Sequence, residues 1–394
     1  MRRPSSLAPA FALAFMACLA AGASWNIYAP AGPWLALVPV VAVPFGRRWW
    51  SRWSLAVAYY LAGSISIVPS AASFFGAHAL GAGLVAWVAS SLLLALPWVL
   101  ARGPVGVLAA VLIDAVPPFG LIGWLSPLTA AGALFPGAGM AGLVLCLLLI
   151  LALGALARHR HSAAAWSVIL FATGSAIGCV TTFTPPGPPD GWVGVNTSVQ
   201  PSGGGGDVMK AIQNNQKVIA AALKKGKGAR VVVLPEAVLD DWWPGTQAQI
   251  AAAVPPGQLW LIGAETQTPG YRWDAVVAVR HGRADAVPVF KAALPMPWSM
   301  WRPGSEGSYL ASWWEPVRVV AGDRVWASIC FDQVLPWVWF EGLIQQPDVV
   351  LVPSNAWWAM GWNPAPAIQE AQADAWANLT GAKAVLTANG FGVY

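Results

Sequence analysis

The first 189 residues contain eight arginines, no lysine and a single acidic residue, Asp114. A helix that crosses the hydrocarbon core of a bilayer needs about 20 predominantly apolar residues. Apolar stretches of that kind, separated by arginine, proline or glycine, occupy residues 7–23, 30–45, 54–75, 79–100, 104–125, 138–157 and 163–183. We therefore expect residues 1–185 to form a membrane domain of about seven transmembrane helices.

The arginines occur only in every second loop between these stretches. If the N-terminus is cytoplasmic, all of them fall on the cytoplasmic side, as the positive-inside rule requires. A seventh crossing then leaves residues 190–394 outside the cytoplasm. We predict a multi-pass inner-membrane (plasma-membrane) protein with a periplasmic C-terminal domain. A cleaved signal peptide is the alternative for the first stretch, but it would put the later stretches out of phase with the arginines. The arginines concerned are Arg2, Arg3, Arg47, Arg48, Arg52, Arg102, Arg158 and Arg160.

Asp114 lies within the fifth stretch, just before Pro117-Pro118. An acid inside a membrane span is a functional candidate by default. No lysine, arginine or histidine lies at a comparable depth in the sequence to pair with it. A capping or cavity-lining role is therefore favoured over a role in proton relay, and both remain open at this point.

The overall composition excludes two broad classes of protein. Hydrophobic residues make up 57% of the chain and charged residues 10%, which is the reverse of a disordered sequence and far from an ordinary soluble enzyme. The net positive charge comes from arginines that flank apolar segments. The basic residues of the second half cluster only at residues 224–227, which we interpret as a helix end, so no nucleic-acid partner is expected.

The second half changes to short apolar runs that alternate with polar or helical stretches. We expect helices over residues 207–225 and 365–380. Continuous apolar runs of this length are typical of strands buried on both faces. The alternation predicts an α/β domain over residues 190–394 with stacked sheets and helices outside them. The expected strands are 193–200, 230–236, 259–265, 275–280, 287–291, 325–332, 348–355 and 383–390.

Cys330 is the only cysteine after residue 189, so it has no partner for the disulfide that an exported domain usually forms. Such a thiol is either a small core residue or a reactive group. Glu236 and Lys291 also end expected strands, where open α/β sheets bind ligands. A carboxylate can accept a thiol proton, and an ammonium can stabilise a thiolate and an oxyanion. No metal-ligand spacing is present, and no cofactor is expected.

Three blocks in this order, VVLPEAVLDDW, VFKAALPMPWS and SICFDQ, resemble the Glu, Lys and Cys blocks of the nitrilase superfamily of carbon-nitrogen hydrolases. VPSNAWW and LTANGFG resemble its following strand blocks. With the membrane spans, the chain looks like the apolipoprotein N-acyltransferase type. More closely, it resembles the shortened relatives of that type that are encoded with plasmid transfer genes, the conjugal transfer protein TraB group.

The resemblance implies a nitrilase-like sandwich of α-β-β-α layers, shortened at its C-terminus. It also implies that Glu236 is a general base, that Lys291 stabilises the oxyanion and that Cys330 is the nucleophile. The acyltransferases carry an acid eight residues after the lysine, where this chain has Ser299.

Sixteen of the 25 tryptophans follow residue 189, and many come soon after the motif blocks. Tryptophan prefers the membrane–water interface. We therefore interpret these rings as walls of a site that faces the bilayer and admits a lipid tail; ordinary core packing is the alternative. The residues expected to bind substrate are Trp242, Trp298, Phe331, Asp332, Asn355, Trp357 and Trp358.

Three functions follow as hypotheses. The first is acyl transfer from a membrane phospholipid through a Cys330 thioester to an amine acceptor such as a lipoprotein, in the service of conjugal transfer or envelope assembly. The second is hydrolysis of a small C–N substrate by the same triad, as in an amidase or nitrilase. The third is a non-catalytic accessory protein of the conjugation machinery.

Overall fold

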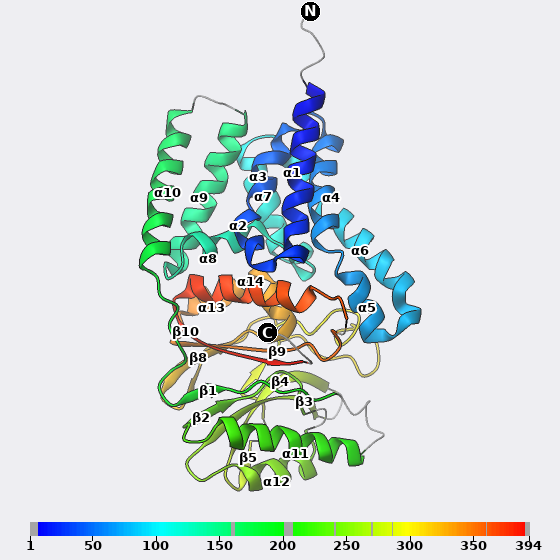
Figure 1. Ribbon diagram of the computed structural model, residues 1–394, viewed down its shortest axis with the longest axis vertical. Coiled ribbons are helices and arrows are strands. Elements are labelled where there is room, and N and C mark those ends of the chain that lie inside the picture. Colours follow the sequence, from blue (N-terminus) through cyan, green and yellow to red (C-terminus); the bar gives the residue numbers. More distant parts are fainter. Residues whose placement is uncertain are drawn as a thin grey trace, which may run out of the picture. The chain divides into compact units, whose positions relative to one another are not determined.

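Figure 1 shows the computed structural model, which describes residues 7–158, 162–200, 208–239, 242–268, 271–285, 287–359 and 361–390. The chain forms two compact units, and each is described by itself. The first comprises residues up to Thr184 with Val334–Trp337 and Gly361–Gly381, and the second comprises Pro185–Gln333, Val338–Met360 and the residues from Ala382 onward. Arg2, Arg3 and Arg160, which contribute to the predicted topology, lie outside the described residues.

The first unit is helical, as predicted. Among the residues that the structure describes, four helical segments are long and apolar enough to cross a membrane: Pro9–Ile27, Ala77–Leu100, Gly139–Ala157 and Ala163–Thr182. A fifth is counted if α4 and α5, which meet at a bend of 44°, form one broken span. The helices are α1 (Leu7–Ile27), α2 (Gly32–Leu35), α3 (Val38–Ala42), α4 (Trp49–Gly63), α5 (Ile67–Phe75), α6 (Leu80–Leu94), α7 (Pro104–Ala115), α8 (Ala130–Leu134), α9 (Gly139–Arg158) and α10 (Ala163–Thr182).

The other two expected spans are shorter helical segments. Ala29–Phe45 is divided into α2, α3 and flanking 3-10 turns, and each piece has a proline at its first or second position. α7 ends at Ala115, just before Pro117-Pro118. Proline lacks the backbone N–H and clashes with the preceding turn, so it stops a helix. The part of the chain that the structure describes thus contains four to five helices of spanning length, and the seven-span topology stays a prediction.

Asp114 of α7 is buried, and neutral side chains satisfy one of its oxygens. Its Oδ2 accepts hydrogen bonds from the Tyr60 hydroxyl at 2.9 Å and from Trp98 Nε1 at 2.8 Å. These donors come from α4 and from the 3-10 turn Pro97–Leu100. The contacts tie three segments of the helical unit together, so Asp114 cross-links helical segments, a role outside the expected capping, cavity-lining and relay roles.

The helix expected over residues 365–380 is present as α14 (Ala365–Thr380), and it packs in the first unit. A Cβ on Gly132 of α8 would lie 1.6 Å from the Ala375 carbonyl oxygen, so only glycine permits this approach. Gln372 Oε1 accepts the Leu125 N–H at 3.3 Å. α14 therefore completes the core of the helical unit.

The second unit contains two β-sheets, which confirms the predicted α/β domain with stacked sheets. The first sheet has the order β1 (Trp192–Gly194), β2 (Val231–Val233), β3 (Leu259–Thr268), β4 (Tyr271–Arg280) and β5 (Arg283–Ala284), with β6 (Phe290–Lys291) also paired to β4. The second has the order β10 (Lys383–Asn389), β9 (Val349–Asn355), β8 (Asp323–Ala327) and β7 (Arg318–Val320). β1, β2 and β3 run parallel, as do β10, β9 and β8.

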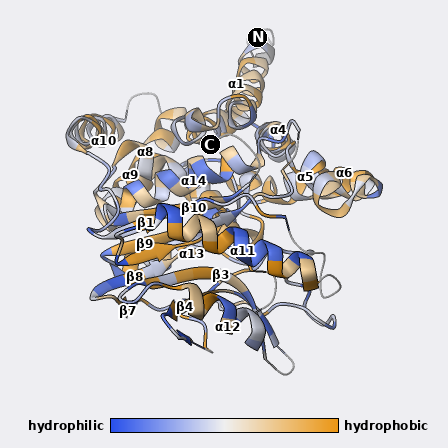
Figure 2. Ribbon diagram, turned by 60° about the horizontal axis from the view of Figure 1, so that its bottom comes forward, coloured by the Kyte–Doolittle hydropathy of each residue, from blue (hydrophilic) through white to orange (hydrophobic). Residues whose placement is uncertain are grey.

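Two separate apolar cores hold this unit together. One fills the space between the sheets and contains Val233, Phe290 and Leu351. The other packs the outer face of the first sheet against α11 (Val208–Lys225) and α12 (Pro244–Ala253), which lie on that side in Figure 1. Figure 2 colours long parts of the central strands as hydrophobic, whereas α11 carries both colours, as a helix with one buried face should. Residue 207, where this helix was expected to begin, lies outside the described residues.

The remaining helix, α13 (Pro336–Gln345), follows the strand that leads to Cys330. Gly342 of α13 faces Trp326 of β8, because a Cβ at this position would lie 2.9 Å from the Trp326 ring. Trp326 and Trp339 make an edge-to-face contact with their ring centroids 5.4 Å apart. These contacts anchor the helix to the second sheet within reach of the strand ends.

Candidate active site

Two of the candidate catalytic residues lie at sharp turns after parallel strands. Glu236 follows β2, and the next residue, Ala237, has a φ of 42°. Cys330 follows β8 at the start of a 3-10 helix (Cys330–Val334) and itself has a φ of 47°. Residues other than glycine seldom adopt this left-handed conformation, and such strain persists where the surrounding structure enforces it. The turns thus fix the directions of both side chains.

The Cys330 thiol and the Glu236 carboxyl are hydrogen-bonded to each other. Burial raises the pKa of Glu236 to about 8, against the lowering effect of hydrogen bonds with Cys330 and Asp274. Burial, followed by the charges of Glu236 and Asp274, raises the pKa of Cys330 well above its usual range. The resting thiol is therefore neutral, and its proton faces a carboxyl that titrates near neutral pH, as a general base should.

Asp274 of β4 is a second buried acid beside Glu236, and the sequence analysis missed it. Its side chain is 2% exposed and hydrogen-bonds to Glu236. Burial, followed by the charges of Glu236, Glu265 and Asp332, raises the pKa of Asp274 well above its usual range. A lone acid at the start of the apolar run DAVVAV was the available signal, because a buried acid must be paired or neutral.

Glu265 of β3 lies directly opposite Asp274 in the antiparallel ladder. Its Oε2 accepts hydrogen bonds from Arg272 Nη2 at 3.0 Å and from the Tyr309 hydroxyl. The Arg272 guanidinium also lies 4.8 Å from the centroid of the Tyr309 ring. The Arg272 guanidinium thus balances the negative charge of Glu265. By contrast, Glu236 Oε2 and Asp274 Oδ1 are buried without a hydrogen-bond partner among the described residues.

Lys291 lies in β6, opposite Ala275 of β4. Its ammonium is 3.9 Å from the centroid of the Trp273 ring, in a cation–π contact. Consecutive residues of β4 therefore serve two of the predicted catalytic residues: Trp273 contacts Lys291, and Asp274 contacts Glu236. The structure joins Glu236 directly to Cys330. Lys291 lies on β6 with its ammonium over Trp273, and its contact with the Glu236–Cys330 pair stays a prediction. Trp273 was also missed, since nothing local in the sequence pairs it with Lys291.

Asp332 was predicted to bind substrate, but the structure gives its carboxylate other partners. The side chain is 1% exposed. It accepts the backbone N–H groups of Ala293 at 2.9 Å, of Leu294 at 2.8 Å and of Ile329 at 3.3 Å. Burial raises the pKa of Asp332 to about 7, although these hydrogen bonds lower it. Asp332 thus fastens the segment that follows Lys291 to the turn that carries Cys330.

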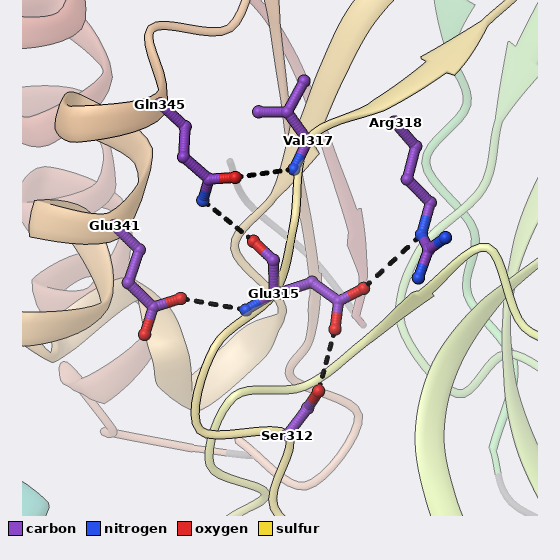
Figure 3. Close-up of polar contacts among 6 residues, drawn as sticks. All are labelled: Ser312, Glu315, Val317, Arg318, Glu341 and Gln345. Atoms are coloured by element: carbon purple, nitrogen blue, oxygen red, sulfur yellow. Dashed lines mark hydrogen bonds and ion pairs between the residues drawn. The ribbon is translucent and has the colours of Figure 1, made fainter.

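A second set of polar contacts holds the segment between β6 and β7 against α13 (Figure 3). Glu341 accepts the backbone N–H of Glu315 at 3.0 Å. Gln345 accepts the Val317 N–H at 2.8 Å and donates to the Glu315 carbonyl at 3.0 Å. Both carboxyl side chains are buried. Helix α13 therefore fixes the position of the Glu315 backbone.

The Glu315 carboxyl faces the opposite direction, toward Lys291. It accepts a hydrogen bond from the Ser312 hydroxyl at 2.9 Å and lies 3.9 Å from Arg318 Nε (Figure 3). Burial raises the pKa of Glu315 to about 7, whereas Ser312, Arg318, the Lys291 charge and a hydrogen bond from the Lys291 backbone lower it. Lys291 is thus flanked by an aromatic ring and by a carboxyl that α13 holds in place.

Asn355, predicted to bind substrate, ends β9 beside the Glu236–Cys330 pair. Its Nδ2 donates to the Glu236 carbonyl oxygen at 2.9 Å, and its Oδ1 accepts from Asn389 Nδ2 at 2.8 Å. A hydrogen bond from its backbone to the Cys330 sulfur lowers the pKa of that thiol. Asn355 therefore positions the turn after β2 and contributes a backbone donor at the sulfur.

Comparison with known proteins identifies the family to which this chain belongs. A conjugal transfer protein TraB from Agrobacterium fabrum is 31% identical over 366 residues, which cover 85% of this chain and 82% of the relative. The chain belongs to the TraB family of conjugal transfer proteins. A probable conjugal transfer protein TraB from Sinorhizobium fredii is 29% identical over 374 residues, covering 90% of this chain and 93% of the relative. No protein-family model matches the chain.

Solved structures similar to this TraB-family chain include carbon-nitrogen hydrolases. The crystal structure of a carbon-nitrogen hydrolase from Helicobacter pylori has 14% identity and a TM-score of 0.35, and the match covers 52% of this chain and 74% of that one. A glutamine-dependent NAD+ synthetase from Acinetobacter baumannii has 18% identity and a TM-score of 0.31, with 41% and 31% covered.

The tryptophans of this TraB-family chain divide into core and surface groups. Trp242, predicted to bind substrate, is 8% exposed and packs in the core beneath α11 and α12. Trp298 is 65% exposed, in the segment that follows Lys291. Trp357 and Trp358 are half-buried, and Trp358 Nε1 donates to the Asn355 carbonyl at 3.2 Å. Trp298 and the Trp357–Trp358 pair therefore remain candidates for substrate contact.

Phe331, the last predicted substrate-binding residue, is 7% exposed beside Cys330. Within the described part of the chain, no group of His, Cys, Asp and Glu side chains is arranged to hold a metal ion. The chemistry that the described contacts provide is therefore that of a thiol, a base that titrates near neutrality and a backbone donor from Asn355. This set suits attack on a carbonyl carbon with proton transfer to Glu236.

Proposed function

We propose that this protein is a membrane-bound thiol enzyme that transfers an acyl group from a phospholipid to an amine acceptor, in the service of conjugal transfer. The observation that carries the proposal is the hydrogen bond between the Cys330 thiol and the buried Glu236 carboxyl. The membership of the TraB family supports the link to conjugation, and the apolar helices of spanning length support a membrane location.

In the first half of the reaction, the Cys330 sulfur attacks an ester carbonyl of the lipid. The S–C bond forms while the thiol proton passes to Glu236, and the charge on the carbonyl oxygen is stabilised by Lys291 and nearby backbone N–H groups. The C–O bond then breaks, and the departing alcohol of the lysophospholipid takes the proton from Glu236. The product is a Cys330 thioester.

In the second half, the amine of the acceptor attacks the thioester. The N–C bond forms, the C–S bond breaks, and the proton lost by the amine returns to the thiol through Glu236. Water must be kept away from the thioester until the amine arrives. The exposed rings of Trp298, Trp313 and Trp314 are suited to insert into the interfacial region of a bilayer, which would bring the lipid ester to the site and limit access of water.

The test is to incubate the full chain in detergent with phospholipid vesicles that contain isotope-labelled acyl chains, without any amine. Peptide mass spectrometry should find the labelled acyl group on Cys330, removable by hydroxylamine, and absent from Cys330→Ala. Cys18, Cys146 and Cys179 in the same sample serve as internal controls and should stay unmodified.

Other outcomes would favour other functions. Turnover of small soluble amides without lipid, and no lipid adduct, would favour a hydrolase that releases the same thioester with water. A normal conjugation frequency in a strain carrying Cys330→Ala would contradict a catalytic role and favour an accessory protein.

A further inference from the structure

We propose that Asp274 holds a proton in the Glu236–Asp274 pair and donates it in a hydrogen bond to Glu236, which favours the ionised form of Glu236 that accepts the proton of Cys330. Asp274 is then a positioning residue that acts through Glu236. The inference rests on the proposed role of Cys330 as a nucleophile and adds a requirement for a second acid.

The contact between the two carboxyls implies a proton between them. Both side chains are buried, at 5% and 2% exposure, and they are hydrogen-bonded to each other. Two carboxylates in contact repel each other strongly and have no hydrogen to share. One proton allows one carboxyl to donate to the other and removes the repulsion. The buried pair then carries one negative charge.

The surroundings indicate which carboxyl carries the proton. Glu236 also accepts a hydrogen bond from the Cys330 thiol, which favours its ionised form. The charges of Glu265 and Asp332 act on both carboxyls, so they do not distinguish them. Asp274 has no donor comparable to the Cys330 thiol, because its Oδ1 is buried without a hydrogen-bond partner among the described residues. The proton therefore resides on Asp274.

The other charged and titratable groups around the Glu236–Asp274 pair contact other partners. Glu265 is bound by Arg272 and Tyr309. Asp332 accepts three backbone N–H groups. The Lys291 ammonium lies on the Trp273 ring. Asp274 is thus the residue placed to donate a proton to Glu236.

The proton on Asp274 determines how charge moves in the Glu236–Asp274 pair during the reaction. When the sulfur forms its bond to the carbonyl carbon, the thiol proton moves to Glu236 and the pair becomes neutral, while the negative charge appears on the carbonyl oxygen. When the leaving group takes the proton from Glu236, the pair returns to its one-proton state. Asp274 keeps its own proton throughout, so atoms and charges balance.

The experiment measures alkylation of Cys330 by iodoacetamide in the full chain in detergent, by peptide-resolved mass spectrometry between about pH 5 and pH 9. Asp274→Asn can still donate a hydrogen bond to Glu236, so its rate should lie within about threefold of the wild-type rate, with the same pH profile. Asp274→Leu cannot donate, so the ionised form of Glu236 loses a hydrogen bond and the pKa of Glu236 should rise further. Its alkylation rate should fall about tenfold or more, with a midpoint shifted to higher pH.

The matched control is Asp285→Asn. Asp285 belongs to the same sheet region but pairs at the surface with Arg280 and Arg283. Its substitution should leave the profile unchanged. Circular dichroism checks that each variant is folded.

Two results would overturn the inference. Identical profiles for wild type, Asp274→Asn and Asp274→Leu would show that Asp274 does not act on Glu236. A rate for Asp274→Asn more than about tenfold above wild type would show that Asp274 is ionised and suppresses the thiolate; this second result is decisive even if Asp274→Leu fails to fold. Alkylation needs no acyl donor, so a missing lipid adduct together with the expected alkylation pattern would contradict only the proposed function.

Discussion

The side-chain amide of Asn355 donates a hydrogen bond to the backbone carbonyl oxygen of Glu236 at 2.9 Å. The two residues stand at the ends of β9 and β2, which belong to different sheets of the second unit. Because the Asn355 backbone also hydrogen-bonds to the Cys330 sulfur, one residue connects the turn that carries the proposed base with the proposed nucleophile.

Asn355→Ala should therefore weaken both stability and reactivity. It removes the bond to Glu236 and leaves the buried Asn389 amide without one of its partners, at a cost of about 1–3 kcal/mol. The midpoint of thermal unfolding in detergent should fall, and Cys330 alkylation should slow. Asn196→Ala is the control, because Asn196 also accepts a backbone N–H, that of Ala388 at 3.0 Å, but is exposed. Equal effects of the two substitutions would contradict the special position of Asn355.

Trp273 should be needed to hold Lys291. Trp273→Leu removes the aromatic face under the ammonium, a contact worth about 0.5–2 kcal/mol, so formation of the acyl adduct on Cys330 should slow by roughly twofold to thirtyfold. Trp273→Phe keeps an aromatic face and should retain most of the rate. The measurement is the time course of the labelled adduct. If the leucine and phenylalanine variants react at the same rate, the cation–π contact does not position Lys291.

The buried carboxyls on and near α13 predict an unusual dependence of stability on pH. Burial raises the pKa of Glu341 to about 8, so the folded chain favours its protonated form. This contribution to stability is complete below the unfolded pKa, about 4.3, and is lost as the pH rises through about 8. The midpoint of thermal unfolding should therefore decrease between about pH 5 and pH 9.

Glu341→Gln tests that dependence. The amide oxygen of glutamine can still accept the Glu315 N–H, which Glu341 accepts at 3.0 Å, but the side chain no longer titrates. The variant should be more stable than wild type above about pH 8, by on the order of 1 kcal/mol, and its stability should depend less on pH. Glu306→Gln, at an exposed position, is the control. An unchanged slope in Glu341→Gln would show that Glu341 is not the titrating group.

Reporter fusions at two positions distinguish the counts of membrane spans. With a cytoplasmic N-terminus, seven crossings place a reporter at Gly103 inside and one at Tyr394 outside. Five spans of the kind seen in the structure place both outside, and four place both inside. The positive-inside pattern predicts the first result. Activity of both reporters on the same side would contradict the seven-span topology.

The pattern of apolar residues in the sequence made much of this fold predictable. The apolar runs that form β2, β8, β9 and β10 predict strands. Glu236 and Cys330 lie in the turns that follow β2 and β8. Because open α/β sheets bind ligands at the carboxyl ends of their strands, a site containing both residues could be expected from the sequence. Their direct contact could not, since β2 and β8 belong to different sheets. The spacing of apolar stretches likewise predicted a helical first half, and the prolines of its second and fifth stretches marked the two segments that the structure shows as shortened.

The rest depends on contacts that no local pattern reveals. The register of β3 on β4 sets Asp274 opposite Glu265, and the pairing of β6 with β4 brings Lys291 to Trp273. Trp242 follows the Glu236 block in the sequence, but its side chain packs in the core. Proximity to a motif therefore did not predict its position. α14 was recognised as a helix, yet its close approach to Gly132 in the helical unit was not.

The most direct test of whether Glu236 activates Cys330 is the rate at which iodoacetamide alkylates Cys330 at neutral pH in wild type and in Glu236→Gln. Glutamine keeps the size of the side chain but cannot accept the thiol proton, so the rate should fall at least about tenfold. Equal rates in the two proteins, both folded by circular dichroism, would contradict the assignment of Glu236 as the base for this thiol.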